Sequence, residues 1–214
     1  NKEFLLSEEY INLRKNDITD KAVLHNPIDY KKSGTVYLAT ADKDGNMVSF
    51  IQSNYMGFGS GIVIDGTGIS IQNRGHTFSL DESHHNKLEP RKRTYHTIIP
   101  GFLMNDNEPL GPFGVMGGFM QPQGHLQVVM NVVDYKMNPQ EALDAPRFRW
   151  DEKLNVALER SFDDFVAQKL KEKGHIIKIE EHSGGFGRGQ IIFKSKTGYI
   201  AGTETRCDGT ISYY

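Results

Sequence analysis

The sequence has 214 residues, of which 37% are hydrophobic and 22 are glycine, a composition typical of a folded, turn-rich protein rather than a disordered one. Its net charge of −2 gives no reason to expect a nucleic acid as a partner. No segment approaches the roughly 18 consecutive apolar residues of a transmembrane helix. Cys207 is the only cysteine, which excludes an internal disulfide and a metal site of the CxxC type.

The N-terminal part predicts one short helix followed by an exposed linker. The sequence does not begin with Met, so we expect a fragment or a processed product and make no prediction of the compartment. Ser7 can cap a helix that ends near Asn16, with Glu8 and Glu9 at its positive end. The segment 25–34, HNPIDYKKSG, has no periodicity and is typical of a linker.

Two runs of strand-forming residues, 35–41 and 47–52, predict a β-hairpin. The DKDGN between them has Asp-Gly at its centre, the usual signal of a tight hairpin turn. A calcium loop would place its glycine at the sixth position, whereas here it is at the fourth position, so the turn is favoured. Further strands are predicted at 61–64, 68–73, 96–104, 176–181, 190–195 and 198–204, with a second hairpin turn at 196–198.

A central block of the sequence predicts helices. The segment 125–135 is apolar on most faces, so we expect a helix that is buried between layers. Asn138 as the cap, Pro139 at the first position and Glu141 at the third position predict a second, short helix that ends near Ala145.

The segment 161–173 predicts a third helix. It has an apolar face, Ser161 and Asp164 as a capping pair, and Gly174 as a stop. Strands therefore precede and follow the helices, and the sequence has no repeated βα unit. This order favours a layered α/β protein with mainly antiparallel sheets over a doubly wound parallel one.

Local patterns for ligand binding are weak. The glycine-rich segment 57–68 lacks both the GxGxxG fingerprint and the GKS/T ending of phosphate-binding loops, so we do not expect nucleotide binding. The eight histidines lack zinc-ligand spacing, so we expect surface histidines. Gly117 and Gly118 could offer two backbone N–H groups to an anion, as in an oxyanion hole, but the local sequence favours a tight turn.

Thr35 follows Gly34 at the start of the first predicted strand. An internal threonine is a poor nucleophile because its hydroxyl needs a base. If the bond between Gly34 and Thr35 were cut, the new α-amine, with a pKa of about 7.7 to 8.0, would lie on the same residue as the hydroxyl. Cleavage would therefore supply the nucleophile and its base together.

Several motifs in order resemble the γ-glutamyltranspeptidase family of N-terminal-nucleophile hydrolases. They are TVYLATADKDGNMVSFIQS (35–53), GFGSGIV (57–63), GTGISIQNRGHTFS (66–79), PRKR (90–93), GVMGG (114–118), LQVVMNVVDYKMNPQEALDAPRF (126–148) and AGTETRCDG (201–209). The resemblance implies a four-layer αββα sandwich. It also implies that residues 1–34 end a large subunit, and that residues 35–214 form the small catalytic subunit after autocleavage.

The resemblance assigns the catalytic positions. Thr35 falls on the nucleophile, and Ser53 replaces a threonine whose hydroxyl supports it. Gly117 and Gly118 fall on the oxyanion-hole pair, which reverses the local preference for a turn. No metal or cofactor is implied; the expected partners are the large subunit of the same precursor and a small γ-glutamyl or acyl amide.

The substrate-recognition positions match less well. Where the family holds the glutamyl α-amino group with Asn, Gln and Asp, this sequence has Tyr55, Arg74 and Thr77. Where the family has paired serines for the α-carboxylate, it has His96 and Thr97.

The changed charge at these positions affects the expected substrate. Arg74 repels an α-ammonium group, so acidic or uncharged acyl groups are also expected. The sequence therefore predicts a γ-glutamyltranspeptidase-like amidohydrolase. Two alternatives stay open: a glutaryl-type amidase related to the cephalosporin acylases, and an unprocessed homologue that only binds ligands.

Overall fold

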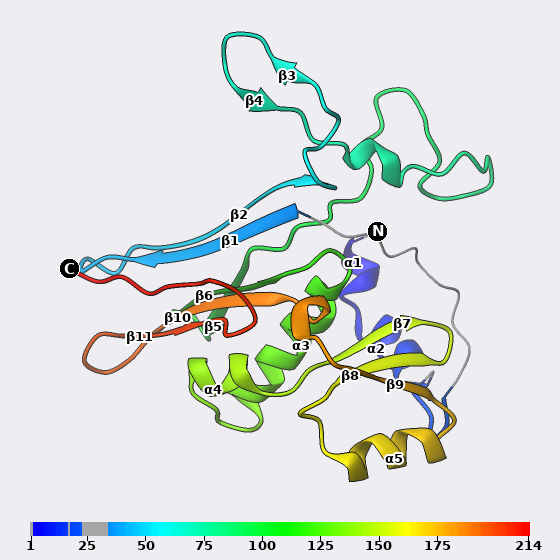
Figure 1. Cartoon of the computed structure of the whole chain (residues 1–214), viewed down its shortest axis with the longest axis vertical. Helices are drawn as coiled ribbons and strands as arrows, with labels where there is room; N and C mark the ends of the chain where they lie inside the picture. Colours follow the sequence, from blue (N-terminus) through cyan, green and yellow to red (C-terminus); the bar gives the residue numbers. More distant parts are fainter. Residues whose placement is uncertain (1, 17, 23–33) are drawn as a thin grey trace. The chain divides into compact units, whose positions relative to one another are not determined.

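The computed structural model describes residues 2–16, 18–22 and 34–214 (Figure 1). Contacts divide the chain into two compact units, which among the described residues contain 2–22 with 148–181, and 34–147 with 182–214. The predicted linker, except for Gly34, lies outside the described residues.

The first unit combines N-terminal helices with a small sheet. Strand β8 pairs with β7 in antiparallel and with β9 in parallel fashion, and α5 provides the crossover. Its core lies between the sheet and α5, where Val156, Leu158 and Ala167 are buried. The elements are α1 (Lys2–Leu5), α2 (Glu8–Lys15), β7 (Phe148–Glu152), β8 (Asn155–Glu159), α5 (Asp164–Glu172) and β9 (Ile176–Glu180).

Two predictions for this unit need correction. The β8–α5–β9 segment is a βα unit that the sequence reading missed, because β7 and β8 have only five residues each and β7 carries three charged side chains. The cap of α5 is Asp163, whose side chain accepts from the backbone of Phe165 at 2.7 Å, rather than Ser161. The predicted N-terminal helix is confirmed as α2.

The second unit is layered. The hairpin of β1 and β2 packs on β6 and β10 of a four-stranded antiparallel sheet with the order β11-β10-β6-β5. Helices α3 and α4 cover the other face of that sheet (Figure 1). The elements are β1 (Gly34–Ala41), β2 (Met47–Tyr55), β3 (Val63–Ile64), β4 (Ile69–Ser70), η1 (Arg74–Thr77), β5 (Gly101–Asn105), β6 (Glu108–Met116), α3 (Met120–Val133), α4 (Pro139–Asp144), η2 (Ser183–Gly185), β10 (Arg188–Lys194) and β11 (Tyr199–Thr203).

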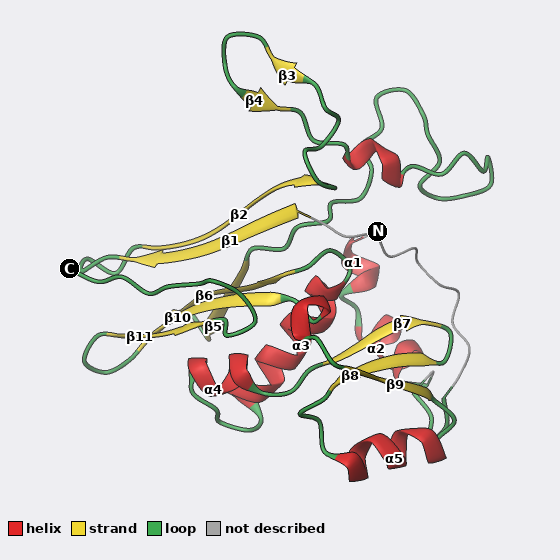
Figure 2. Cartoon of the chain, in the orientation of Figure 1, coloured by secondary structure: helices red, strands yellow, loops and turns green. Residues whose placement is uncertain are grey.

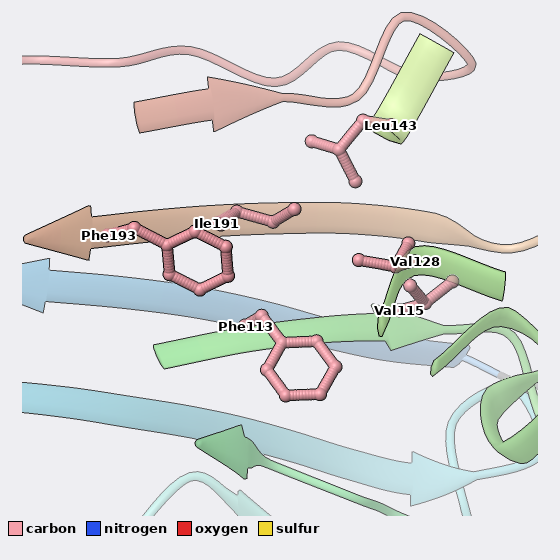
Figure 3. Close-up of a cluster of buried hydrophobic side chains, with 6 residues drawn as sticks. All are labelled: Phe113, Val115, Val128, Leu143, Ile191 and Phe193. Atoms are coloured by element: carbon pink, nitrogen blue, oxygen red, sulfur yellow. The ribbon is translucent and has the colours of Figure 1, made fainter. Parts of the chain in front are cut away.

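The core of the second unit lies between the four-stranded sheet and its helices. Figure 3 shows the side chains from β6 and β10 that meet those from α3 and α4. Alternation along β6 sends Phe113 and Val115 into this core and leaves Gly114 facing the hairpin. The buried members are Phe113, Val115, Val128, Leu143, Ile191 and Phe193.

Several predictions for the second unit are confirmed and others are wrong in extent. Both hairpins are present, and the capping box of Asn138 and Glu141 starts α4. Strand β6 was missed because Pro109 and Pro112 interrupt the strand pattern. The run 96–104 is a strand only from Gly101 onward, 61–64 and 68–73 shrink to two-residue strands, and α3 begins at Met120, before the predicted start.

Candidate active site

Thr35 lies at the start of β1, directly opposite Ser53 of β2 in the antiparallel register. Its side chain faces the four-stranded sheet together with that of Tyr37, and Thr35 is only 4% exposed. The register shifts between Gly34 and Thr35, which leaves Gly34 opposite Tyr55. The Gly34–Thr35 peptide bond therefore lies at an irregularity in an otherwise regular hairpin.

A chain of hydroxyl groups links Thr35 to the carbonyl of the preceding residue. Thr35 Oγ1 donates to Ser53 Oγ at 2.9 Å, and Ser53 Oγ donates to the carbonyl oxygen of Gly34 at 3.1 Å. Ser53 Oγ also accepts from the backbone N–H of Tyr55 at 2.9 Å, and Tyr55 adopts a left-handed φ of 74°. Ser53 thus connects the hydroxyl and the carbonyl that cleavage at Thr35 would join.

The packing of Tyr37 on Gly114 places Thr35 relative to the sheet below it. A Cβ atom at Gly114 would lie 2.5 Å from the Tyr37 ring, so only glycine permits this approach. Strands β1 and β6 point in opposite directions (Figure 3). Thr35 precedes Tyr37 on β1, and Met116 follows Gly114 on β6. Because the two strands are antiparallel, Thr35 and Met116 therefore lie toward the same end of the layers.

Gly117 and Gly118 follow β6 at that end and precede α3. Gly117 has a φ of 145°, which strongly favours glycine, and a Cβ there would come within 3.1 Å of the Cα of Gly187. Gly118 has a left-handed φ of 61°. The two carbonyls accept from the backbone of Met120 and Gln121. Among the described residues, no group accepts a hydrogen bond from the N–H of either glycine, so both donors are available to an anion.

Arg74 opens the short helix η1 and is 7% exposed. Its Nε donates to Thr97 Oγ1 at 2.7 Å, and its Nη2 donates to the carbonyl of Ser53 at 3.4 Å. The guanidinium carbon lies 5.7 Å from the centre of the Tyr55 ring. Burial lowers the pKa of Arg74, although a guanidinium remains charged at any physiological pH.

The other predicted recognition residues are only partly brought together. Thr97 contacts Arg74, whereas Thr77 Oγ1 bonds to the carbonyl of Arg74 and to Thr94 Oγ1 at 2.6 Å. His96 is exposed, and none of the described residues forms a hydrogen bond with its ring. Of the paired residues 96 and 97, only Thr97 is therefore tied to the rest of the site.

The sequence reading missed two residues of α3 that hold the segment carrying Thr97. The fully buried Gln121 side chain donates to the carbonyl of Thr97 at 2.7 Å and accepts from the backbone N–H of Ile99 at 2.9 Å. His125 Nε2 lies 3.0 Å from the carbonyl of Ile99. The only sequence signal for this role was that Gln121, a polar residue, lies three residues after the glycine pair and in the first turn of a buried helix.

His125 also corrects the expectation that the histidines lie on the surface. It is 8% exposed, and its Nδ1 lies 2.6 Å from the carbonyl of Gln121. Burial lowers the pKa of His125, and the two neighbouring carbonyls only partly oppose that shift.

The described residues contain neither a cluster of metal ligands nor a membrane-spanning helix. In those residues there is no group of three or more His, Cys, Asp or Glu side chains that could hold a metal ion. Likewise, no helix within the described ranges has the length and apolarity needed to cross a bilayer.

Comparisons with known proteins agree on one family. A family model described as gamma-glutamyltranspeptidase matches residues 2–214. The crystal structure of a cephalosporin acylase from Bacillus halodurans superposes with a TM-score of 0.91 at 57% identity, covering 100% of this chain and 40% of that one. This likeness confirms the predicted fold class, an α/β sandwich of the N-terminal-nucleophile hydrolase type with mainly antiparallel sheets.

Two curated relatives are similar over most of the chain. The glutathione hydrolase-like YwrD proenzyme of Bacillus subtilis is 41% identical over 184 residues, which is 83% of this chain and 35% of that protein. The oxamate amidohydrolase proenzyme of Klebsiella pneumoniae is 33% identical over 187 residues, which is 84% of this chain and 35% of that protein. The chain thus spans about a third of the length of these relatives.

Proposed function

The chain belongs to the γ-glutamyltranspeptidase family, and on that premise we propose that it supplies the nucleophile, Thr35, of an amide hydrolase or acyltransferase that matures by cleavage at Gly34–Thr35. The observation that carries this proposal is the hydroxyl chain from Thr35 through Ser53 to the carbonyl of Gly34.

The same hydrogen-bonded hydroxyl groups suggest how the precursor is cleaved. Thr35 Oγ1 attacks the carbonyl carbon of Gly34, its proton passes to Ser53 Oγ, and the Ser53 proton passes to the carbonyl oxygen. Collapse of this adduct breaks the C–N bond, transfers a proton to the leaving amine and leaves Gly34 as an ester on Thr35. Water then hydrolyses the ester and frees the carboxylate of Gly34 and the α-amine of Thr35.

The mature site then acts on an amide substrate. The free α-amine of Thr35 takes the hydroxyl proton while the oxygen attacks the substrate carbonyl. The N–H groups of Gly117 and Gly118 stabilise the oxyanion, a role supported by their open donors at the end of the layers where Thr35 lies. The amine product leaves with a proton, and water or a second amine releases the acyl group from Thr35.

A partner is part of the proposal. Residues 1–34 would end the large subunit of the same precursor, and residues 35–214 would form the small catalytic subunit. The outward face of the β1–β2 hairpin supports such a partner because four of its apolar side chains are 41% to 55% exposed, and a group of exposed apolar side chains commonly marks an interaction surface. These side chains are Val36, Leu38, Val48 and Phe50.

The candidate functions differ in the acyl group that would be transferred to Thr35. The names of the relatives include a glutathione hydrolase-like protein, an oxamate amidohydrolase and a cephalosporin acylase. Family membership by itself supports a γ-glutamyltranspeptidase-like amidohydrolase as the first candidate. A glutaryl-type amidase is the second, and the observation that favours it is the buried cation of Arg74 where the family holds an α-ammonium group.

Intact-mass measurement of the full-length protein tests the proposal. We expect two polypeptides, one beginning at Thr35, and turnover of acyl anilides by the cleaved protein. Thr35→Ala should remain a single inactive polypeptide, whereas Thr35→Ser should still be cut because it keeps the hydroxyl. A wild-type protein that stays uncut and inactive under all conditions would instead indicate a homologue that only binds ligands.

A further inference from the structure

Arg74 is a buried cation without a counter-ion among the described residues. At 7% exposure it forms no ion pair with a carboxylate in residues 2–16, 18–22 and 34–214. Its contacts there are a hydroxyl, a backbone carbonyl and an aromatic ring, all of them uncharged. A buried charge of this kind is costly unless a partner neutralises it, so the site favours an anion.

The contacts of the guanidinium leave one edge open. Nε and Nη2 form the edge that faces Thr97 Oγ1 and the carbonyl of Ser53. The opposite edge consists of Nη1 and the second hydrogen of Nη2, and none of the described residues forms a hydrogen bond to Nη1. Two parallel N–H groups at such an edge match the two oxygens of a carboxylate.

The position of this edge is fixed before any ligand binds. Thr97 accepts from Nε, and the Thr97 backbone is itself held by the buried Gln121 side chain at 2.7 Å. Asn73, the residue before Arg74, accepts from the backbone of Met56 at 3.0 Å and donates to the carbonyl of Gly59 at 3.0 Å. Little side-chain entropy is therefore lost when an anion binds.

Arg74 lies close to the reacting hydroxyl. Its Nη2 is 3.4 Å from the backbone carbonyl of Ser53, and the side chain of the same Ser53 is 2.9 Å from Thr35 Oγ1. An acyl group bound to Thr35 can thus reach the guanidinium with a short chain. An ammonium group on that chain would meet a like charge in a poorly solvated position.

We propose that Arg74 binds the free carboxylate of the acyl group, so that the preferred substrates are monoamides of dicarboxylic acids without an α-ammonium group. This inference rests on the proposed function because the acyl group is defined by its transfer to Thr35. It makes Arg74 the residue that selects an acidic acyl group over a neutral one and over a zwitterionic one.

Three p-nitroanilides test it on the mature full-length protein: glutaryl, γ-glutamyl and butyryl. We expect kcat/KM for the glutaryl compound to exceed the values for the γ-glutamyl and butyryl compounds at least about tenfold. The reason is that only the glutaryl group offers Arg74 a carboxylate without an ammonium group beside it, and hydrogen bonds between charged groups are strong. Arg74→Gln should lower the glutaryl value roughly 10- to 100-fold and change the butyryl value less than about threefold. The glutaryl kcat/KM of Arg74→Lys should lie between the values of wild type and Arg74→Gln, because lysine keeps the positive charge but cannot donate two parallel hydrogen bonds to a carboxylate. Arg93→Gln, which removes an exposed arginine, is the matched control and should leave all three values unchanged.

Binding provides a readout that does not depend on turnover. Glutarate should protect wild-type protein against thermal unfolding, and Arg74→Lys should weaken this protection even if Arg74→Gln does not fold. Equal turnover of the glutaryl and butyryl compounds by wild type, or an unchanged preference in Arg74→Lys and Arg74→Gln, would overturn the role of Arg74 while leaving Thr35 as nucleophile. Equal activity of wild type and Thr35→Ala would instead overturn the proposed function itself.

Discussion

The two halves of the candidate site are built in different ways. Thr35 and Ser53 are paired residues of one regular hairpin, and the glycine pair directly follows a strand of the sheet on which that hairpin packs. Arg74 and Thr97 instead lie on the segment between β4 and β5, where Figure 2 shows loop, apart from one short helix. Backbone register positions the first half, whereas side-chain hydrogen bonds position the second.

Under the proposed function, this difference would separate the residues of the chemical step from those that select the substrate. A β-ladder has many cooperative hydrogen bonds, so a change in one loop residue leaves its register intact. The segment between β4 and β5, residues 71–100, is the recognition segment. It is held by a few side chains, namely its own Asn73 and Thr97 and Gln121 of α3, so few substitutions could change the ligand that it binds. Changes to the site residues of the first half should therefore lower the rate of cleavage or turnover, while changes in the second half should alter substrate preference.

Apart from changes at Thr35 itself, the largest effect is expected for Gly117→Ala in the first half. A Cβ at a φ of 145°, 3.1 Å from the Cα of Gly187, should force the backbone to move and so displace the N–H groups that we propose as oxyanion donors. We expect kcat to fall about 10²- to 10³-fold, the usual loss when an oxyanion donor is removed. Gly184→Ala is the control because a Cβ there would meet nothing within 4 Å. A Gly117→Ala protein with normal kcat would place the oxyanion donors elsewhere.

Ser53→Ala removes the hydroxyl that links Thr35 to the carbonyl of Gly34. Cleavage of the precursor should slow roughly 10- to 100-fold because the attacking hydroxyl loses its proton acceptor and the carbonyl loses its donor. The time course of cleavage, followed by intact mass, measures this rate, and Ser53→Thr should restore it. Ser49 lies on the same strand as Ser53, and Ser49→Ala loses only a hydroxyl bond to Tyr37 of β1, so this variant should be cleaved at the wild-type rate. Equal rates for the two alanine variants would contradict the relay.

The sequence predicted the regular half of the site better than the irregular half. The Asp-Gly turn and the strand runs predict the β1–β2 hairpin, although the second predicted strand ended at Gln52, one residue before the partner of Thr35. Strand β6, which leads to the glycine pair, was not predicted. The contact of Arg74 with Thr97 spans 23 residues of loop, and no periodic pattern specifies such a contact. Tertiary packing also buries His125, which local composition placed on the surface.

A change at Gln121 weakens the second half without touching the hairpin. Gln121→Leu leaves the Thr97 carbonyl and the Ile99 N–H without their partners and should cost about 1 to 3 kcal/mol of stability. The KM for the preferred anilide should rise several-fold with a small change in kcat, because Thr97 no longer holds Arg74. Gln121→Glu keeps an acceptor for Ile99, but at neutral pH it turns a buried carboxylate toward the Thr97 carbonyl and should be at least as harmful. A fall in kcat alone would show that Gln121 acts on the glycine pair instead, since its own backbone bonds to Gly118.

The smallest effect is expected for the pH dependence of stability that His125 contributes through its contact with the carbonyl of Ile99. Burial lowers the pKa of His125 in the folded state, so the unfolded chain takes up the proton first as the pH falls. Its contribution to stability is therefore complete above the ordinary histidine pKa of about 6.5, and is lost as the pH falls toward the lower folded value, by at most about 1.4 kcal/mol per pH unit. Urea unfolding of the mature protein between about pH 7 and 5 should show a shallower loss for His125→Gln than for wild type. His85→Gln, which removes an exposed histidine, should follow wild type. If His125→Gln loses stability as steeply as wild type, another group titrates, and the recognition segment is not held by a neutral His125.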